Sequence, residues 1–250
     1  MAEIKMIQNS VYYIKEIPAS EASIIVKQFH YSKKVVSNSK LHLGVFLVET
    51  GKLVGCLQYG PPMNGKRTAS KISDSESMME LNRMVLDDDQ PRNSESMAIA
   101  LCNKYLKKYT NIDYILSFSD GKQGNVGCIY QSSNWVYLGY TVSKSFYDLD
   151  GEIKHSVTVW HQYKEKHPDR DIKTTHEILC DNFDNISIIY SKQHIYVFPL
   201  RKYVKFKFLP QRYPKKDLEV EILSRKWIKR CGSNCSDVEL NTQEVLTPIF

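Results

Sequence analysis

The chain has 250 residues, of which 42% are hydrophobic and 25% charged, and its net charge is +6. This composition supports a real hydrophobic core in one domain with an appendage. No apolar run approaches the roughly 20 residues of a membrane helix, and the N-terminal MAEIKMIQNS lacks the apolar part of a secretion signal, so we expect a cytoplasmic protein without a membrane partner.

The positive charge is concentrated near the C-terminus. Arg201–Arg230 contains 11 lysines and arginines against 3 acidic residues, so the rest of the chain carries a net charge of −2. A surplus confined to one segment indicates a polyanionic partner.

The first predicted elements are a strand, a helix and a hairpin. Val11–Ile17 is rich in β-branched and aromatic residues, which predicts a strand. Ser20 is the predicted N-cap of a helix that reaches about His30. Leu43–Glu49 and Leu53–Tyr59 are apolar runs separated by three residues, a spacing typical of a β-hairpin.

The middle of the chain alternates strands and helices. Asn64–Ser77 is polar with little periodicity and is predicted to be a loop, whereas Met79–Leu86 is predicted to be a strand. Ser94–Tyr109 has apolar residues at helical spacing. Tyr114–Phe118 is a predicted buried strand, followed by a glycine-rich turn and a short helix at Val126–Ser132.

The later signals are weaker. Val136–Val142 and Ser156–His161 are predicted to be closing strands, and Ile186–Tyr190 and His194–Leu200 a second hairpin-like unit. Within Val204–Phe208 apolar residues alternate with lysines, as in a half-buried strand.

The order of elements predicts a mixed α/β fold, with one sheet and helices on its faces. We expect a core in residues 1–165, a basic extension in residues 166–230 that packs on or completes the core, and a tail in residues 231–250.

Several short strings make the sequence more specific than its element order. They are FHYSKK (Phe29–Lys34), LGVF (Leu43–Phe46), GCLQYGPP (Gly55–Pro62), ELNRMVL (Glu80–Leu86), PRNSES (Pro91–Ser96), SFSDGKQGNVGCIYQSSNWVYLG (Ser117–Gly139), QHIYVFPL (Gln193–Leu200) and RYPK (Arg212–Lys215). In this order they resemble the Mom family of phage enzymes, over roughly residues 10–217. The family adds an acetamido-type (carbamoylmethyl) group to N6 of adenine in DNA, which shields phage DNA from host restriction enzymes.

The resemblance implies a fold like that of the GNAT acetyltransferases: a mixed, mostly antiparallel sheet flanked by helices, here with a C-terminal basic, β-rich extension. It also implies acetyl-CoA or another activated donor, held at a helix N-terminus whose amides bind phosphate. The matching residues are Arg92, Asn93, Ser94 and Ser96. Both glycines of the usual loop are missing and Glu95 adds an acid, so an ordinary helix cap is the alternative.

Modification of N6 requires removal of a proton, an activated carbon donor and access to a base that is normally paired. Enzymes gain that access by flipping the base out of the duplex. Asp120 is the best candidate for the base or N6-orienting group, because it ends a predicted buried strand where α/β sheets place ligands. The alternative is a structural Asx turn.

Other catalytic candidates rest mainly on the resemblance. Tyr130, in the I-Y-Q string, would donate a hydrogen bond or protonate a leaving group, and otherwise is a half-buried aromatic. His30 suits proton shuttling and Tyr31 suits stacking on a base, with a helix cap as the alternative for His30. Tyr59, at the end of the hairpin strand, is a candidate for the same site.

Arg83 lies in an otherwise apolar strand, where a buried guanidinium needs an anionic partner such as Asp120 or a ligand. A solvent-facing position is equally compatible with the pattern. The sequence identifies no metal. A site built from His30, Asp120 and His155 is one weak alternative, and Cys231 with Cys235 is another.

Cations neutralise phosphates, so basic residues are the candidates for contact with double-stranded DNA. They are Lys33, Lys34, Arg201, Lys202, Lys205, Lys207, Arg212, Lys215 and Lys216. The alternative is a solvated strand face. If six of these cations contact phosphates, log affinity falls with log salt at a slope of roughly −5.

Three functions therefore remain, in this order. The first is a DNA adenine-modifying transferase, and the second is a GNAT-like N-acyltransferase that acts on a small amine or a protein. The third is a DNA-binding protein without catalytic activity. The missing glycines weigh against the second, and the third predicts that Asp120→Asn leaves function intact.

Overall fold

The computed structural model describes residues 5–30, 33, 35–62, 65–169, 174–215 and 222–234, without the side chains of residues 65–67, 123 and 222. The chain forms two compact units, neither of which is a continuous segment. The first unit comprises Met1–Phe118, Gly127–Gly139 and Ile195–Tyr213. The second comprises Ser119–Val126, Tyr140–His194 and Pro214–Phe250.

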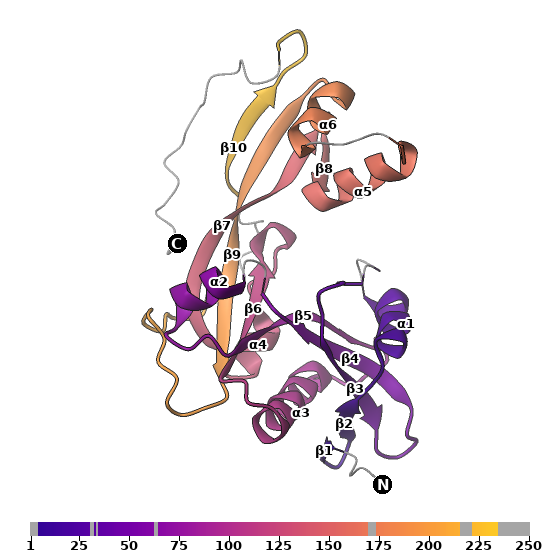
Figure 1. Ribbon diagram of the computed structural model, residues 1–250, viewed down its shortest axis with the longest axis vertical. Helices are drawn as coiled ribbons and strands as arrows, with labels where there is room; N and C mark the ends of the chain where they lie inside the picture. Colours follow the sequence, from indigo (N-terminus) through magenta and orange to yellow (C-terminus); the bar gives the residue numbers. More distant parts are fainter. Residues whose placement is uncertain are drawn as a thin grey trace. The chain divides into compact units, whose positions relative to one another are not determined.

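The first unit is built on a mixed sheet (Figure 1). The first six strands in chain order are β1 (Met6–Gln8), β2 (Tyr12–Glu16), β3 (Leu41–Leu47), β4 (Leu53–Gly60), β5 (Met78–Leu86) and β6 (Tyr114–Asp120). Each of the first four pairs antiparallel with the next. β5 and β6 are parallel and pair only from Met78↔Tyr114 to Glu80↔Leu116. The predicted mixed, mostly antiparallel sheet is therefore confirmed.

Two helices cover opposite faces of this sheet (Figure 1). α1 (Ala19–Phe29) packs through Ala22, Ile25 and Val26 on a small cluster that includes Cys56 and Val85. α3 (Ser94–Tyr109) packs on the larger core. The other helices of the first unit are α2 (Gly65–Ile72) and α4 (Cys128–Ser132).

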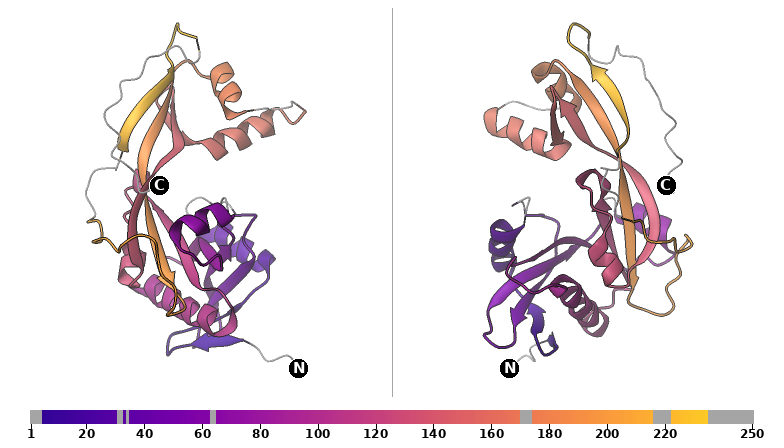
Figure 2. Two further views of the ribbon diagram at one scale, coloured as in Figure 1. Left: turned by 60° about the vertical axis from the view of Figure 1, so that its left-hand side comes forward. Right: turned by 180° about the vertical axis from the view of Figure 1, so that it is seen from behind.

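The second unit has its own small core. Its strands are the later part of β7 (Val136–Leu149), β8 (Glu152–His155), the earlier part of β9 (Ile186–Pro199) and β10 (Ile222–Lys229). Figure 2 shows α5 (Ser156–Lys166) and α6 (Thr175–Asn182) on the same side of these strands. The buried residues between them are Leu149, Val159, Tyr163, Ile178, Leu179, Ile186 and Ile228.

Most of the elements that a clear hydrophobic pattern predicted are confirmed. α3 has the predicted bounds, the β3–β4 hairpin forms, and the strands at β2, β5, β6 and β7 are present. No helix in the described part of the chain combines the length and apolar character needed to cross a membrane.

Five local predictions are wrong. Ser156–His161 begins helix α5 instead of a strand, because the His155 Nδ1 accepts a hydrogen bond from the Val157 amide and Val159 and Tyr163 pack into the core one turn apart. The predicted loop contains α2, with Ala69 and Ile72 buried three residues apart. Ser20 lies inside α1, which has Pro18 at its N-cap.

The fourth error concerns the strand after α6. The predicted hairpin is one continuous strand, β9, because Ser191–Gln193 contains no glycine or proline to turn the chain. The fifth error concerns the basic segment that follows, which forms no regular strand. Val204, Phe206 and Phe208 are half-buried and Lys205 and Lys207 are exposed, as predicted, but a single bridge from Phe206 to Ser73 replaces a ladder.

Candidate functional site

A row of polar residues crosses the α1 face of the first sheet just beyond the apolar patch that α1 covers. His42 on β3 pairs with Gln58 on β4, and Gln58 pairs with Arg83 on β5. In the neighbouring row, Cys56 and Val85 pack under α1. We call His42, Gln58, Arg83 and the adjacent His30 the polar row.

His30 follows the last residue of α1, and its backbone amide completes the helix by donating to the Val26 carbonyl, 3.0 Å away. Burial, and then the nearby Arg83 guanidinium, lower the pKa of His30 to about 4. The imidazole is therefore neutral near pH 7. This corrects the expectation of a near-neutral pKa suited to proton shuttling.

Two residues predicted to share the site with His30 lie on the other face of the sheet, in the core beneath α3. The Tyr59 hydroxyl is fully buried beside the Cys102 thiol, a weak partner, and burial raises its pKa well above the usual value. The Tyr130 hydroxyl lies 2.8 Å from Ser117 Oγ, which is 3.3 Å from the Leu81 carbonyl oxygen. The candidates thus fall into two groups, with the sheet between them.

Asp120 belongs to the second unit. Its carboxylate accepts a hydrogen bond of 3.0 Å from the Lys122 amide and caps the 3₁₀ helix Gly121–Gln123, so the Asx-turn role is real. Burial raises the pKa of Asp120, while Lys122 and His194 oppose that shift. A carboxylate with a raised pKa is a better proton acceptor than an ordinary one.

The N-terminus of α3 is partly committed to the fold. The Ser94 side chain is fully buried, and its hydroxyl contacts the Pro91 carbonyl at 2.6 Å and the Tyr12 hydroxyl at 2.8 Å. Asn93 adopts a left-handed conformation and makes no side-chain cap. Arg92 and Glu95 are exposed beside it.

The basic segment divides into engaged and exposed cations. The Arg201 guanidinium donates to the carbonyls of Lys107 and Thr110 and so caps the end of α3. Lys207 pairs with Asp74 at 2.9 Å. Lys202, Lys205, Arg212 and Lys215 are exposed and have no ion pair within the described residues.

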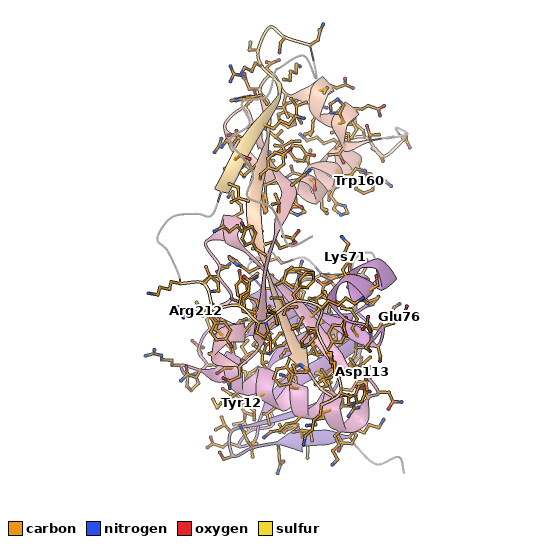
Figure 3. All side chains as sticks on the ribbon, turned by 90° about the vertical axis from the view of Figure 1, so that its left-hand side faces the viewer. Tyr12, Lys71, Glu76, Asp113, Trp160 and Arg212 are labelled. Carbon is orange, nitrogen blue, oxygen red and sulfur yellow. The ribbon has the colours of Figure 1, made fainter. Side chains whose placement is uncertain are left out.

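A buried carboxylate anchors the start of this segment. Asp113, labelled in Figure 3, accepts hydrogen bonds from the hydroxyls of Ser75 and Tyr203, and its carbonyl accepts from the amides of Leu200 and Arg201. The chain after β9 is therefore fixed on the first unit, with its free lysines turned to solvent.

Some predictions fall outside the described residues: Tyr31, Lys34, Lys216 and Cys235. Lys33 is exposed, with a left-handed backbone. No group of three or more potential metal ligands occurs in the part of the chain that the structure describes. The His155 ring lies edge-on to the Phe146 ring, with 5.0 Å between the ring centroids, and His155 caps α5.

Three buried polar residues of the sheet were not predicted as site residues: His42, Gln58 and Ser117. Each interrupts an apolar strand, and a buried polar residue needs a reason to be there. The strings LHLGV and CLQYG contain His42 and Gln58, but their apolar neighbours alone are enough to predict the strands.

Comparison with known proteins gives a specific result. Residues 11–215 match the model of the Mom protein family. Over 143 residues the chain is 44% identical to a protein of Escherichia phage Mu named methylcarbamoylase mom. That alignment covers 55% of this chain and 57% of the phage Mu protein, so it spans little more than half of the relative.

Among solved structures, the chain is similar to acetyltransferases. One is the ribosomal-protein-S5-alanine acetyltransferase of Vibrio fischeri, with a TM-score of 0.45 and 9% identity over 79% of this chain and 98% of that one. Another is a GNAT-family acetyltransferase of Bacillus anthracis, with a TM-score of 0.42 and 10% identity over 78% and 98%. A likeness of this extent supports no conclusion about activity.

Proposed function

Because this chain belongs to the Mom protein family, we propose that it is a DNA-modifying enzyme that transfers an acetamido-type (carbamoylmethyl) group to N6 of adenine. The observation that carries the proposal is the match over residues 11–215, together with 44% identity to a protein named methylcarbamoylase. The protection of DNA from restriction is part of the same proposal.

In the proposed reaction the N6 nitrogen forms a bond to the donor carbon as the bond from that carbon to its leaving group breaks. N6 is a weak nucleophile because its lone pair is delocalised into the ring, so loss of its proton must accompany attack. We assign that proton to the Asp120 carboxylate, whose burial raises its pKa and strengthens it as a base. The leaving group departs with the bonding electron pair and takes up a proton from solvent, because Tyr130 lies in the core beneath α3, across the sheet from the polar row.

The α3 N-terminus fits the pyrophosphate of acetyl-CoA poorly. The Ser94 amide donates to Pro91 and the Met97 amide to Asn93, which leaves the Glu95 and Ser96 amides for an anion. The Ser94 hydroxyl is already bonded within the fold, and the Glu95 carboxylate opposes a second negative charge. We therefore derive no step through acetyl-CoA and propose only an activated carbon donor.

The exposed cations suit the phosphates of double-stranded DNA. Lys202, Lys205, Arg212 and Lys215 lie within 14 residues of one another on a segment without regular structure. Arg201 and Lys207 are left out of this assignment because their charges are used within the fold.

Restriction protection tests the function as a whole. DNA recovered from bacteria that express the chain is treated with restriction enzymes whose sites contain adenine. We expect resistance with the wild type and full cleavage with Asp120→Asn, at equal soluble protein levels.

Full cleavage with both proteins would contradict the proposal, and saturable acetylation of an amine would then favour the acyltransferase. Resistance that survives Asp120→Asn would favour a DNA-binding protein without catalysis.

A further inference from the structure

The polar row contains a hydrogen-bond acceptor that the fold leaves unused. Gln58 is fully buried in the middle of a strand, yet its Oε1 has no hydrogen-bond partner among the described residues. A buried acceptor without a donor costs roughly 1–3 kcal/mol, so such atoms are rare in folded proteins. A ligand that brings a donor would remove this cost.

The orientation of the Gln58 amide is fixed by its neighbour on β3. Gln58 Nε2 lies 3.0 Å from His42 Nδ1. Burial lowers the pKa of His42, so its imidazole is neutral and can accept the amide hydrogen at Nδ1. In the His42 tautomer that carries its proton on Nε2, this contact holds the Gln58 Nε2, and the amide then presents its oxygen on the opposite side.

The surroundings of the row restrict what can reach this oxygen. On one side α1 covers the neighbouring apolar row. On the other side Gly60 lets the Asn38–Ser39 segment lie directly on the sheet, since a Cβ at Gly60 would come within 2.5 Å of the Asn38 carbonyl. At its β5 end the row meets solvent, because Arg83 is only partly buried.

A β-bulge interrupts the pairing of β4 and β5 at this position. The register of β4 and β5 shifts between Gln58 and Tyr59, immediately after the Gln58–Arg83 pair. Bulges of this kind are common beside functional sites. The unused acceptor, the fixed amide, a partly exposed guanidinium and the bulge therefore occur together.

We infer that Gln58 is the residue that selects adenine, with its Oε1 accepting a hydrogen bond from the exocyclic amine of an extruded purine. This rests on the proposed function and names the group that reads its substrate. A glutamine amide pairs well with the edge of adenine, whereas a 6-oxopurine would set its carbonyl against the Gln58 oxygen. His42 is a positioning residue that acts through the amide.

The test measures discrimination between bases. Three duplexes carry adenine, unsubstituted purine or hypoxanthine at one position opposite an abasic site, so that the base leaves the stack at little cost. We expect the wild type to bind the adenine duplex about tenfold more tightly than the other two, as one hydrogen bond allows.

Four variants isolate the acceptor. Gln58→Met keeps the length of the side chain but removes the acceptor, and should bind all three duplexes equally, within about twofold of the wild-type affinity for purine. Gln58→Glu restores an oxygen and should recover part of the preference. His42→Phe frees the amide to rotate and should lower the preference, whereas Cys56→Ala, in the neighbouring row, should leave it unchanged.

An unchanged adenine preference in Gln58→Met would overturn the inference, as would a wild-type protein that does not distinguish the three duplexes. Thermal unfolding of each variant separates loss of folding from loss of discrimination. If base preference depends on Gln58 but DNA from expressing cells stays unmodified, the inference stands and the proposed reaction fails.

Discussion

The two faces of the first unit's sheet are built from different kinds of residue. The α3 face is an apolar core that includes Leu43, Val45, Leu57 and Leu81. The α1 face becomes polar one row beyond Cys56, at His42 and Gln58, and the chain keeps these polar groups buried at a cost in stability. We therefore expect the α3 face to serve the fold and the α1 face to hold the ligand proposed above.

Neighbouring residues on β4 give the largest expected contrast. Leu57 and Gln58 are both fully buried but point to opposite faces. Leu57→Ala should lower the free energy of unfolding by about 3 kcal/mol, since it leaves a cavity. Gln58→Met should change it by less than about 1 kcal/mol, because it also removes an unsatisfied acceptor. Urea unfolding of the two variants measures both values, and equal losses would contradict the difference between the faces.

The pH dependence of stability sharpens the account of the α1 face. The pKa of His30 is about 4 in the folded chain and 6.5 in the unfolded one. The unfolded state therefore binds the extra proton as pH falls, so His30 should cost the fold about 2 kcal/mol between pH 7 and pH 5. Wild type and His30→Gln are compared by urea unfolding at both pH values. A variant with the same pH dependence as the wild type would show that His30 is not held neutral.

The Tyr12 hydroxyl tests the structural role of the α3 N-terminus. It contacts Ser94 Oγ at 2.8 Å and Gln90 Oε1 at 2.9 Å. Tyr12→Phe should lower the free energy of unfolding by about 1 kcal/mol, as expected for buried hydrogen bonds. A scan of thermal unfolding measures it. If Tyr12→Phe leaves the stability unchanged but abolishes the modification activity, Ser94 would instead have a role in binding the activated carbon donor.

The smallest effects concern the exposed cations. Lys202→Ala and Lys205→Ala should each reduce the slope of log affinity against log salt by about 1 if the lysine contacts a phosphate. Lys207→Ala is the matched control, since Lys207 already pairs with Asp74. Titrations of duplex DNA at several salt concentrations measure the slopes. If the slope falls equally in all three variants, the ion pair with Asp74 does not prevent Lys207 from contacting DNA.

The sequence predicted elements whose pattern is local. The helical spacing of apolar residues defined α3, and the two apolar runs with a short connection defined the β3–β4 hairpin. It failed where tertiary contacts decide: α5 begins with β-branched residues but packs through Val159 and Tyr163, and β9 runs through a polar stretch.

The candidate site was predicted less well than the fold. Asp120 is predicted from its place at the end of a buried strand together with the resemblance, and Tyr130 from the resemblance; both roles stay predictions. Spacing along the chain could not reveal that the sheet separates Tyr59 and Tyr130 from His30 and Arg83, because facing depends on strand register. Nor could it reveal that the Arg201 guanidinium, which was predicted to contact DNA, caps the end of α3.

The central claim is that this chain modifies the exocyclic nitrogen of adenine. Mass spectrometry of nucleosides from the DNA of expressing cells tests it most directly, with fragmentation to separate base from sugar. We predict a heavier deoxyadenosine whose added mass stays on the base, and its absence with Asp120→Asn. Unaltered deoxyadenosine in several hosts that contain the soluble wild-type protein, or added mass on another nucleoside, would contradict the claim.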